Sequence, residues 1–249
     1  MEEFVKDGER VDDLQIGGLR IIQNPRKFCF GIDAVMLANF ATVKKGDTVL
    51  DFGTGTGIIP LILAGKTKAS RIIGIEIQEE MAEMAGRSVR MNRLEERIRI
   101  IHGDIRNIGE YVKDSSADLV VSNPPYMDGG HGLINPDDSK AIARHEIMCT
   151  LDDLIGSAAK VLKDGGRLAL IHRSSRMVDV LSLMREKGIE PKKLRMIHSA
   201  VDKDSNLFLV EGNKSGGRFL KVQNPLIIYN QGQIYTDEIH SIYYNGERM

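Results

Sequence analysis

The sequence predicts an α/β fold, with one domain built on a mostly parallel sheet of about seven strands and helices on both of its faces. From about residue 48 to residue 170, short apolar and β-branched runs alternate with amphipathic stretches, which is the pattern of βαβ units. The chain has 249 residues, of which 42% are hydrophobic, and this is enough to form the core of one large domain. Since no internal repeat, long linker or break in composition divides the sequence, we predict a single domain.

Seven apolar runs are the predicted strands. The first five alternate with helical stretches, so they are expected to be parallel and to end at a common edge of the sheet. The last two follow a final helix. The runs are residues 48–50, 71–75, 98–101, 118–121, 167–171, 193–197 and 206–210.

Four stretches between these runs are predicted helices. Residues 58–64 follow the first strand, and residues 78–91 place methionine and valine side chains on one face, as expected for a helix packed on a core. Thr150 is the predicted N-cap of a third helix, which Gly165 and Gly166 are expected to end. Residues 174–187 form the fourth.

The composition limits the classes of protein that the chain can belong to. Lys and Arg number 34 and Asp and Glu number 35, a net charge of −1, so any surface for nucleic acid or membrane must be local. Cys29 and Cys149 are the only cysteines, which favours a reducing compartment and excludes a thiolate zinc site. The first residues lack a signal-peptide pattern, and no apolar run approaches the roughly 20 residues of a membrane span. We therefore expect a cytoplasmic protein without a membrane segment or a bound metal.

A glycine-rich loop follows the first predicted strand. Its glycines are Gly53, Gly55 and Gly57. Glycine permits a tight turn and a close approach of the backbone to a ligand, and the helix after the loop offers free amide groups at its N-terminus. The loop therefore predicts a nucleotide-like ligand. The dinucleotide fingerprint needs glycine where Ile58 stands, which disfavours a nicotinamide cofactor.

Three acidic residues follow the first three predicted strands. Asp51 ends a buried strand, where its carboxylate needs a donor or a cation. Glu76 is placed to bind two ribose hydroxyls, with a solvated strand end as the alternative. Asp104 either accepts a hydrogen bond from an adenine amino group, with Ile105 packed on the ring, or caps a helix. Acids at three successive strand ends favour a ligand site at this edge.

The motif Asn-Pro-Pro-Tyr at residues 123–126 directly follows the fourth predicted strand. Its two prolines end the strand and make the loop rigid, which fixes the side chain of Asn123 and the carbonyl of Pro124 as two acceptors. An exocyclic amine has two hydrogens to donate to such a pair, and Tyr126 offers a ring on which a planar base can stack. A turn with a structural asparagine is the alternative for this motif in isolation.

In this order, the glycine loop, the acids and Asn-Pro-Pro-Tyr resemble the class I S-adenosylmethionine-dependent methyltransferases that act on amino nitrogens. The resemblance covers about residues 28–212. Within that group, residues 28–37, 143–146 and 171–173 resemble the bacterial enzymes that methylate the 6-amino group of adenine-37 in valine tRNA. Relatives often carry Thr where Ile32 stands, so a hydroxyl role at this position is not carried over.

The resemblance implies a Rossmann-like class I methyltransferase domain, S-adenosylmethionine as cofactor and tRNA as substrate. The residues implied to bind the cofactor are Gly31, Asp33, Ala34, Asp51, Gly53, Gly55, Gly57, Glu76, Ile77, Asp104, Ile105 and Asn123. The implied catalytic residues are Asn123, Pro124, Pro125 and Tyr126. An in-line transfer to nitrogen needs alignment more than a strong base, so we assign Arg144, His145 and Glu146 to bracing the substrate loop rather than to catalysis.

The chain is expected to divide into three segments. Residues 1–45 are a lead-in that packs over the cofactor site, residues 46–212 are the methyltransferase core, and residues 213–249 are an extension with a hairpin. Binding of tRNA needs local positive charge, and residues 185–221 hold nine Lys or Arg and five Asp or Glu. A solvated face explains this excess equally well. Arg173, Arg176 and the tyrosines of the extension are further candidates.

Four other functions stay open. A methyltransferase acting on a glutamine amide of a protein uses a similar Asn-Pro-Pro-Tyr, but its expected N-terminal helical domain is missing. Methylation of DNA adenine is disfavoured because no separate recognition domain is evident. A nicotinamide dehydrogenase would differ in the cofactor that raises its melting temperature. The fourth is a catalytically silent RNA-binding module, against which the intact loop and Asn123 argue.

Overall fold

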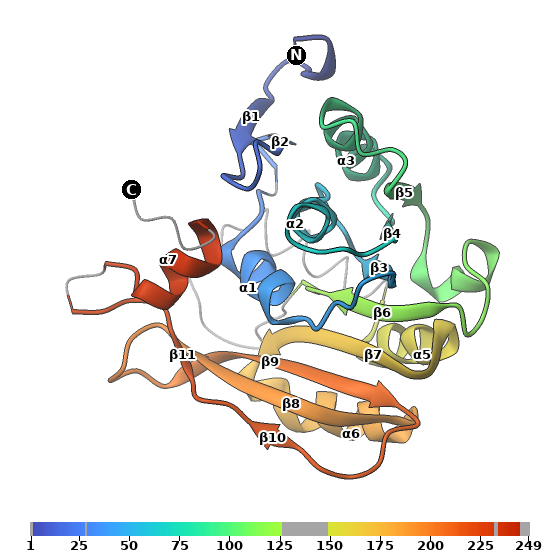
Figure 1. The fold of residues 1–249 in the computed structure, drawn as a ribbon, viewed down its shortest axis with the longest axis vertical. Coiled ribbons are helices and arrows are strands. Elements are labelled where there is room, and N and C mark those ends of the chain that lie inside the picture. The colour runs from blue at the N-terminus through green and yellow to red at the C-terminus, as the bar shows by residue number, and fades with distance from the viewer. Residues whose placement is uncertain (1, 28, 126–148, 232–233, 245–249) are drawn as a thin grey trace.

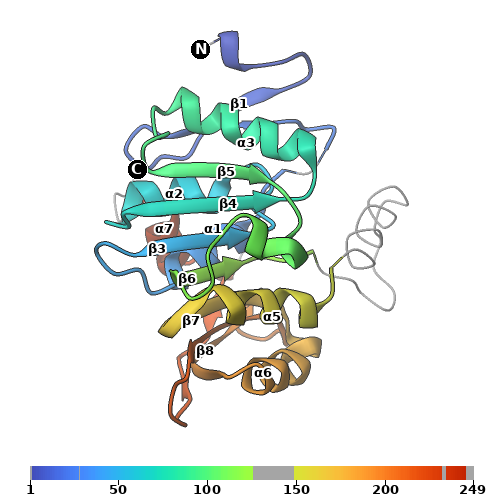
Figure 2. The same cartoon turned by 90° about the vertical axis from the view of Figure 1, so that its right-hand side faces the viewer.

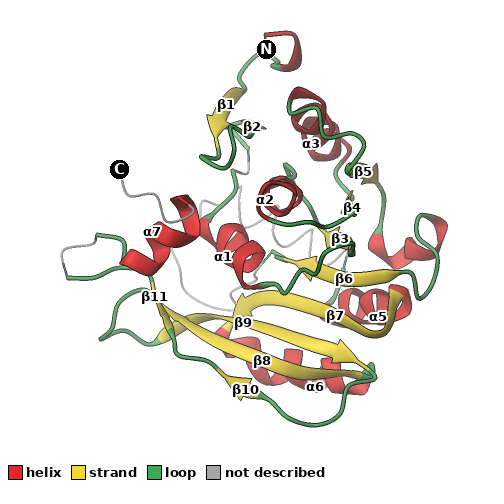
Figure 3. Ribbon diagram, in the orientation of Figure 1, coloured by secondary structure: helices red, strands yellow, loops and turns green. Residues whose placement is uncertain are grey.

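The computed structural model describes residues 2–27, 29–125, 149–231 and 234–244. Its centre is one mixed sheet with helices on both faces, and a small two-stranded sheet lies beside it (Figures 1 and 3). The predicted α/β fold is therefore confirmed.

All seven predicted strands are present in the central sheet. The strand order is β10-β8-β9-β7-β6-β3-β4-β5, with β11 also paired to β8. Strands β3 to β7 are parallel, and β9 runs antiparallel to both of its neighbours. The bounds are β3 Thr48–Phe52, β4 Arg71–Glu76, β5 Ile98–His102, β6 Ala117–Ser122, β7 Leu162–Arg173, β8 Ile189–His198 and β9 Ser205–Lys214.

The sheet is larger than the predicted seven strands. Strands β10 (Lys221–Val222) and β11 (Leu226–Ile227) add to it by parallel pairing with β8. The lead-in forms a separate antiparallel pair, β1 (Arg10–Asp13) with β2 (Arg20–Gln23). These strands have two to four residues each, which is too short for a period of two to stand out in the sequence.

The helices form two layers, one on each face of the central sheet, and each layer has its own hydrophobic core. Figure 1 shows α1, α2 and α7 on one face and α5 and α6 on the other. The first layer consists of α1 (Ile32–Phe40), α2 (Ile58–Lys66), α3 (Glu79–Met91) and α7 (Asp237–Tyr244). The second consists of the 3-10 helix η2 (Ile105–Glu110), α5 (Leu151–Val161) and α6 (Met177–Glu186), which follows the 3-10 turn η3 (Ser174–Arg176).

The start of α5 agrees with the sequence, and its end does not. The Thr150 hydroxyl accepts from the backbone N–H of Asp153, and the Asp153 carboxylate accepts from the backbone N–H of Thr150, which is a capping box. The helix ends at Val161 rather than at Gly165, because Leu162 is already extended, fully buried and paired with Ala117 of β6.

The N-terminal residues are anchored on α3. The 3-10 turn η1 (Glu2–Phe4) precedes an ion pair between Arg87 and Glu9 at 2.6 Å, and both side chains are about 95% buried. Two backbone N–H groups of β2 also donate to side chains at α3, from Ile22 to Ser88 and from Arg20 to Asn92, the C-cap of α3. The lead-in is therefore held mainly by α3 of the first helical layer.

The C-terminal extension contains more than the predicted hairpin. An isolated antiparallel bridge joins Tyr229 to Tyr235, and the N–H of Thr236 donates to the carbonyl of Ile228. The helix α7 follows, which the sequence analysis did not predict, and its Ile239 is fully buried against the core of the first layer. Residues 232 and 233 of the predicted hairpin lie outside the described residues.

Candidate functional site

The predicted site residues collect at the carboxyl edge of the parallel strands. In Figure 2 the arrows of β3, β4 and β5 point toward the same side of the molecule. Phe52 at the end of β3 is in register with Ser122 at the end of β6, and the Ser122 hydroxyl donates to the Phe52 carbonyl at 2.8 Å. Gly53 and Asn123 therefore leave the sheet side by side. The strand order reverses between β3 and β6, and α/β sheets bind ligands at such a switch point.

The glycine loop has the backbone geometry that the sequence predicts. Gly53, Gly55 and Gly57 have φ angles of 72°, 55° and 86°, a left-handed conformation that side chains disfavour. Gly57 is the N-cap of α2, and a Cβ there would lie 3.2 Å from the Cβ of Ala85 in α3. The loop thus ends tightly against α3 and directs the N-terminus of α2 to the carboxyl edge.

Glu76 ties this loop to the end of β4. Its side chain is 96% buried, and its two carboxylate oxygens accept from the backbone N–H groups of Gly55 at 2.8 Å and of Gln78 at 2.9 Å. Ile77 is half-buried, and its carbonyl lies 3.1 Å from Nε2 of His102 at the end of β5. The solvated strand end considered for Glu76 is therefore wrong, since burial and two backbone hydrogen bonds hold this carboxylate.

Asp51 is fully buried beneath the loop. Its Oδ2 accepts from the Thr54 hydroxyl at 2.6 Å, while Oδ1 has no hydrogen-bond partner among the described residues. Burial raises the pKa of Asp51 to about 7; the charge of Glu76 adds to this rise and the Thr54 hydrogen bond opposes it. A carboxyl group in this position has capacity for one more donor or cation, as the sequence predicts.

Asp104 adopts the capping role that the sequence left open. It is the N-cap of η2, where its Oδ1 accepts from the backbone N–H of Arg106, and it forms an ion pair with the Arg106 guanidinium. These contacts hold the pKa of Asp104 below its usual range. Ile105 packs against the core of the second layer. A Cβ on Gly103 would lie 2.7 Å from the ring of Tyr111, so a larger residue in this turn would have to displace that ring.

Asn123, Pro124 and Pro125 directly follow β6 in an irregular segment. Asn123 and Pro124 are half-buried and Pro125 is exposed. Tyr126 lies outside the described residues, and so do Arg144, His145 and Glu146. The structure therefore brings Asn123 to the glycine loop and leaves the expected role of Tyr126 a prediction.

Helix α1 brings Gly31, Asp33 and Ala34 toward the same edge. The segment after α1 is fixed near the amino ends of the strands, because the Arg167 guanidinium at the start of the parallel part of β7 donates to the Thr42 carbonyl at 2.9 Å. The helix runs from there back toward the carboxyl edge, so its first turn, with Asp33, lies at that edge. Gly31 is its N-cap, and Ala34 is buried.

Three contacts of the site were missed from the sequence. The Thr54 hydroxyl binds Asp51, His102 lies against the Ile77 carbonyl, and Ser122 links β6 to β3. Thr54 alone carried a signal, because it lies inside the glycine loop three residues after Asp51. The other two depend on the pairing of strands far apart in sequence.

The side chain of His172 is buried in the sheet and is not exposed at the site. It is 97% buried in β7, and its Nδ1 accepts from the backbone N–H of Arg173. Burial lowers the pKa of His172 to about 4, so the ring is neutral at pH 7.

Ion pairs offset part of the charge excess of residues 185–221, because two basic residues of this segment pair with acids outside it. Arg185 pairs with Glu190 at 3.2 Å and Lys187 pairs with Asp152 at 2.8 Å. Lys193 pairs with Glu211, and Arg195 forms two 2.7 Å contacts with Glu238 of α7. The structure therefore favours the solvated-face alternative for much of this segment.

The part of the chain that the structure describes shows neither a metal-binding cluster nor a membrane-spanning helix. No group of three or more His, Cys, Asp or Glu side chains is arranged there to hold a metal ion. None of the helices described is long and apolar enough to cross a bilayer.

Comparison with known proteins fits this arrangement of strands and loops. The model of the family described as "Methyltransferase domain" matches residues 43–224. The chain belongs to this methyltransferase family. A curated relative from Porphyromonas gingivalis is 33% identical over 187 residues, covering 73% of this chain and 72% of the relative. It is named tRNA1(Val) (adenine(37)-N6)-methyltransferase.

This methyltransferase also resembles a second curated relative and a solved structure. A relative of the same name from Tolumonas auensis is 35% identical over 142 residues, and this alignment spans 57% of both chains. A solved structure from Agrobacterium tumefaciens, described as a predicted O-methyltransferase, has a TM-score of 0.69 at 24% identity and covers 86% of this chain and 96% of its own. That structural likeness concerns the fold alone, and it confirms the expected class I methyltransferase architecture.

Proposed function

We propose that this methyltransferase transfers a methyl group from S-adenosylmethionine to the 6-amino group of an adenine in tRNA, with adenine-37 of a valine tRNA as the specific target. The observation that carries the proposal is the placement of Asn123 beside Gly53 at the switch point of the sheet. The names of the curated relatives support the nucleotide and the tRNA. Their alignments span 57% and 72% of those relatives, so the substrate is proposed for this chain rather than carried over.

The carboxyl edge fits S-adenosylmethionine on three structural grounds. The left-handed glycine loop lets a ligand approach the backbone closely. Asp51 has one buried carboxylate oxygen that the described residues leave without a hydrogen bond, and the cofactor carries an ammonium group that such an oxygen can accept from. Glu76 is held rigidly by two backbone N–H groups, and carboxylate oxygens retain further lone pairs for ribose hydroxyls.

Each remaining cofactor residue has a proposed place around this core. Asp104 and Ile105 hold the adenine end, where Asp104 remains an acceptor although it also caps η2. Gly31, Asp33 and Ala34 of the first turn of α1 close over the methionine end, and Ile77 borders the ribose. When bound, S-adenosylmethionine supplies an activated methyl group.

The residues of the chain then orient the target amine. Asn123 Oδ1 and the Pro124 carbonyl accept the two hydrogens of the exocyclic amine, which directs the nitrogen lone pair along the transfer axis. Pro125 keeps the segment rigid, and Tyr126 stacks on the base. The nitrogen becomes strongly acidic as it gains positive charge, so it can release its proton to water, and the reaction needs alignment by the two acceptors more than a strong general base.

The other functions are less favoured. No curated relative reported above is named as an enzyme of protein glutamine or of DNA, and the family match argues against a dehydrogenase. A silent RNA-binding module would not need the buried carboxylates beneath the loop. Since tRNA is the proposed substrate, we propose the cytoplasm as the compartment and tRNA as the partner.

Transfer of tritium from labelled S-adenosylmethionine tests this function. We expect label in 6-methyladenosine when unmodified total tRNA is the substrate, and none in protein or DNA offered in parallel. Label in protein would favour the glutamine-amide reaction instead. Measurable cofactor binding without transfer to any substrate would favour the silent module.

The variant Asn123→Ala tests the proposed site. Loss of one preorganised polar contact to the reacting group costs on the order of 100-fold in kcat. We expect that loss together with a cofactor Kd within about twofold of the wild type, measured by calorimetry, since removing one of many cofactor contacts at the rim shifts binding by well under 1.4 kcal/mol. Asn224→Ala, at an exposed position after β10, is the matched control and should leave both values unchanged. A near-normal rate for Asn123→Ala would remove this residue from catalysis.

A further inference from the structure

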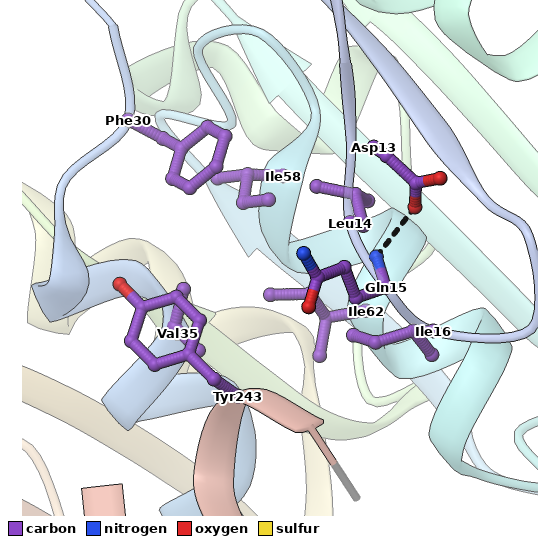
Figure 4. A pocket seen from close by; sticks show the side chains of 9 residues that line it. All are labelled: Asp13, Leu14, Gln15, Ile16, Phe30, Val35, Ile58, Ile62 and Tyr243. Atoms are coloured by element: carbon purple, nitrogen blue, oxygen red, sulfur yellow. Dashed lines mark hydrogen bonds between the residues drawn. The ribbon is translucent and has the colours of Figure 1, made fainter. Parts of the chain in front are cut away.

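A cavity of about 160 Å³ lies between the two ends of the chain and the helices α1 and α2 (Figure 4). Its walls come from the link between β1 and β2, the starts of α1 and α2, and α7. The side chains that matter here are Gln15, Ile16, Phe30, Val35, Ile58 and Tyr243. Pockets for drug-sized ligands have volumes of about 300–1,000 Å³. This cavity therefore suits a single planar ring system rather than a whole cofactor.

The cavity borders the proposed active site without being part of it. Phe30 directly precedes Gly31, the N-cap of α1, and Ile58 directly follows Gly57, the N-cap of α2. Both helices begin at the carboxyl edge of the sheet, where Asn123 lies. A polymer that places one residue at Asn123 can therefore reach the cavity with a neighbouring residue.

Aromatic rings give the cavity a preference for flat ligands. Tyr243 is the last ring of a ladder of three tyrosines, in which Tyr229 stacks on Tyr235 at 5.2 Å and Tyr235 stacks on Tyr243 at 6.0 Å between centroids. The interplanar angles are 13° and 22°. The ladder fixes the orientation of Tyr243 on one wall, and Phe30 stands on another. Nucleobases stack on such side chains irrespective of sequence.

Gln15 adds a group that can read the edge of a base. In Figure 4 its carboxamide points toward the rings of Phe30 and Tyr243. The backbone of Gln15 is held in a left-handed conformation at φ 55°, and its N–H donates to Oδ1 of Asp13 at 2.7 Å. A carboxamide both donates and accepts, as the edges of nucleobases do. The Asp13 carboxylate on the same rim disfavours a phosphate group.

From these features we propose that the cavity is a second base-binding subsite, which takes one unstacked base of the same RNA strand close to the adenine that is methylated. This subsite rests on the proposed function and extends it, because it makes the enzyme bind a single-stranded loop with two bases turned out of the stack. Both chain ends contribute to RNA selection through Gln15 and Tyr243.

The test combines variants of the cavity with an abasic scan of the RNA. The substrate is a stem-loop RNA carrying the methylated adenine, together with a set of the same RNAs that each lack one base of the loop. Stacking of a base on an aromatic side chain is worth about 1–3 kcal/mol, which corresponds to roughly 5- to 150-fold. We expect Tyr243→Ala to raise the KM for RNA about tenfold or more, while kcat and the Kd of the cofactor stay within about twofold.

Matched variants separate stacking from packing. Tyr243→Phe keeps the ring and should retain a near-normal KM. Val178→Ala truncates an apolar side chain that is 71% exposed on α6, in the opposite helical layer and outside the cavity lining, and it should change nothing. Gln15→Ala should alter the dependence of KM on the identity of the base that enters the cavity. Because Tyr243→Ala can lower the melting temperature, the abasic scan on wild-type enzyme provides evidence that needs no variant.

The decisive result is a coupling between protein and RNA. Removal of one base near the target should raise the KM of the wild-type enzyme for RNA. With that abasic RNA, Tyr243→Ala should raise the KM no further. Transfer to RNA with no sensitive abasic position and an unchanged KM for Tyr243→Ala would overturn the subsite alone. Binding of free adenosine that needs Tyr243, without any abasic effect, would also overturn it. No transfer to RNA by wild-type enzyme would overturn the proposed function and the subsite together.

Discussion

At the scale of single residues, the site depends on carboxylates that the fold buries and then partly satisfies. Glu76 receives two backbone N–H groups, whereas Asp51 receives one hydroxyl and loses its contact with water. This difference explains why burial raises the pKa of Asp51 to about 7. A group that costs stability in the free protein and gains a partner on binding is typical of a ligand site.

The pKa of Asp51 predicts a pH-dependent stability. The ordinary aspartate pKa of 3.8 applies to the unfolded chain, so between about pH 4 and pH 7 the folded state binds more protons at this position. The contribution of Asp51 to stability therefore falls as pH rises through this window and is constant above it. Asp51→Asn removes this contribution.

We expect the melting temperature of Asp51→Asn, relative to wild type, to rise between pH 4.5 and pH 8, and its affinity for S-adenosylmethionine to fall. Thermal unfolding at several pH values measures the first effect, and calorimetry measures the second. If the difference in melting temperature between the two proteins does not change with pH over this range, Asp51 is ionised in the folded state as well as in the unfolded state.

At the scale of elements, local sequence signals set where helices begin more reliably than where they end. The capping box of α5 uses Thr150 and Asp153, three residues apart, and both are visible in the sequence. The end of α5 is set by Leu162, which the pairing of β7 with β6 pulls into the sheet. The two glycines that looked like a helix stop lie beyond this point.

The capping box gives a prediction at this scale. Thr150→Ala removes the acceptor for the Asp153 N–H and should lower the free energy of unfolding by about 1 kcal/mol. Thr150→Ser keeps the acceptor and should stay within about 0.5 kcal/mol of wild type. Urea denaturation measures both changes. Equal losses for the two variants would show that the methyl group of Thr150, and not its oxygen, stabilises the start of α5.

At the scale of the whole molecule, ion pairs anchor both ends of the chain, the lead-in on α3 and the helix α7 on β8. Arg87 binds Glu83 on its own helix and Glu9 of the lead-in, and its guanidinium also contacts the carbonyl of Phe4. The hydrogen bond from Arg87 holds the pKa of Glu9 below its ordinary value. Arg195 plays the matching part for α7 through Glu238.

Removal of Arg87 should therefore release the lead-in. Arg87→Met leaves the buried carboxylate of Glu9 without its cation, which costs about 3 kcal/mol in the free energy of unfolding. It should also expose residues 2–9 to limited proteolysis. Arg10→Met breaks an ion pair with Asp12 in which the arginine is 55% exposed, and its effect should stay below about 1 kcal/mol. Similar losses for both variants would contradict the assignment of Arg87 as the anchor.

Much of this protein can be read from its sequence because the signals are local. The apolar runs of the seven strands, the glycines of the loop, the acids at the strand ends and Asn123 all stand within a few residues of the element that positions them. These features were sufficient for the fold class and the expected ligand. The role of Asp104 stayed open at this level, since one acid after a strand can cap a helix or bind a base.

Only the tertiary structure decided which of these local features meet. The contact of Ser122 with Phe52 joins residues 70 positions apart, and it places Asn123 beside the glycine loop. The pairing of β10 and β11 with β8, the docking of α7, and the ion pair of Arg195 with Glu238 likewise join distant segments. The physical reason is that strand order and helix docking depend on burial of side chains against partners from elsewhere in the chain, which no pattern within one segment encodes.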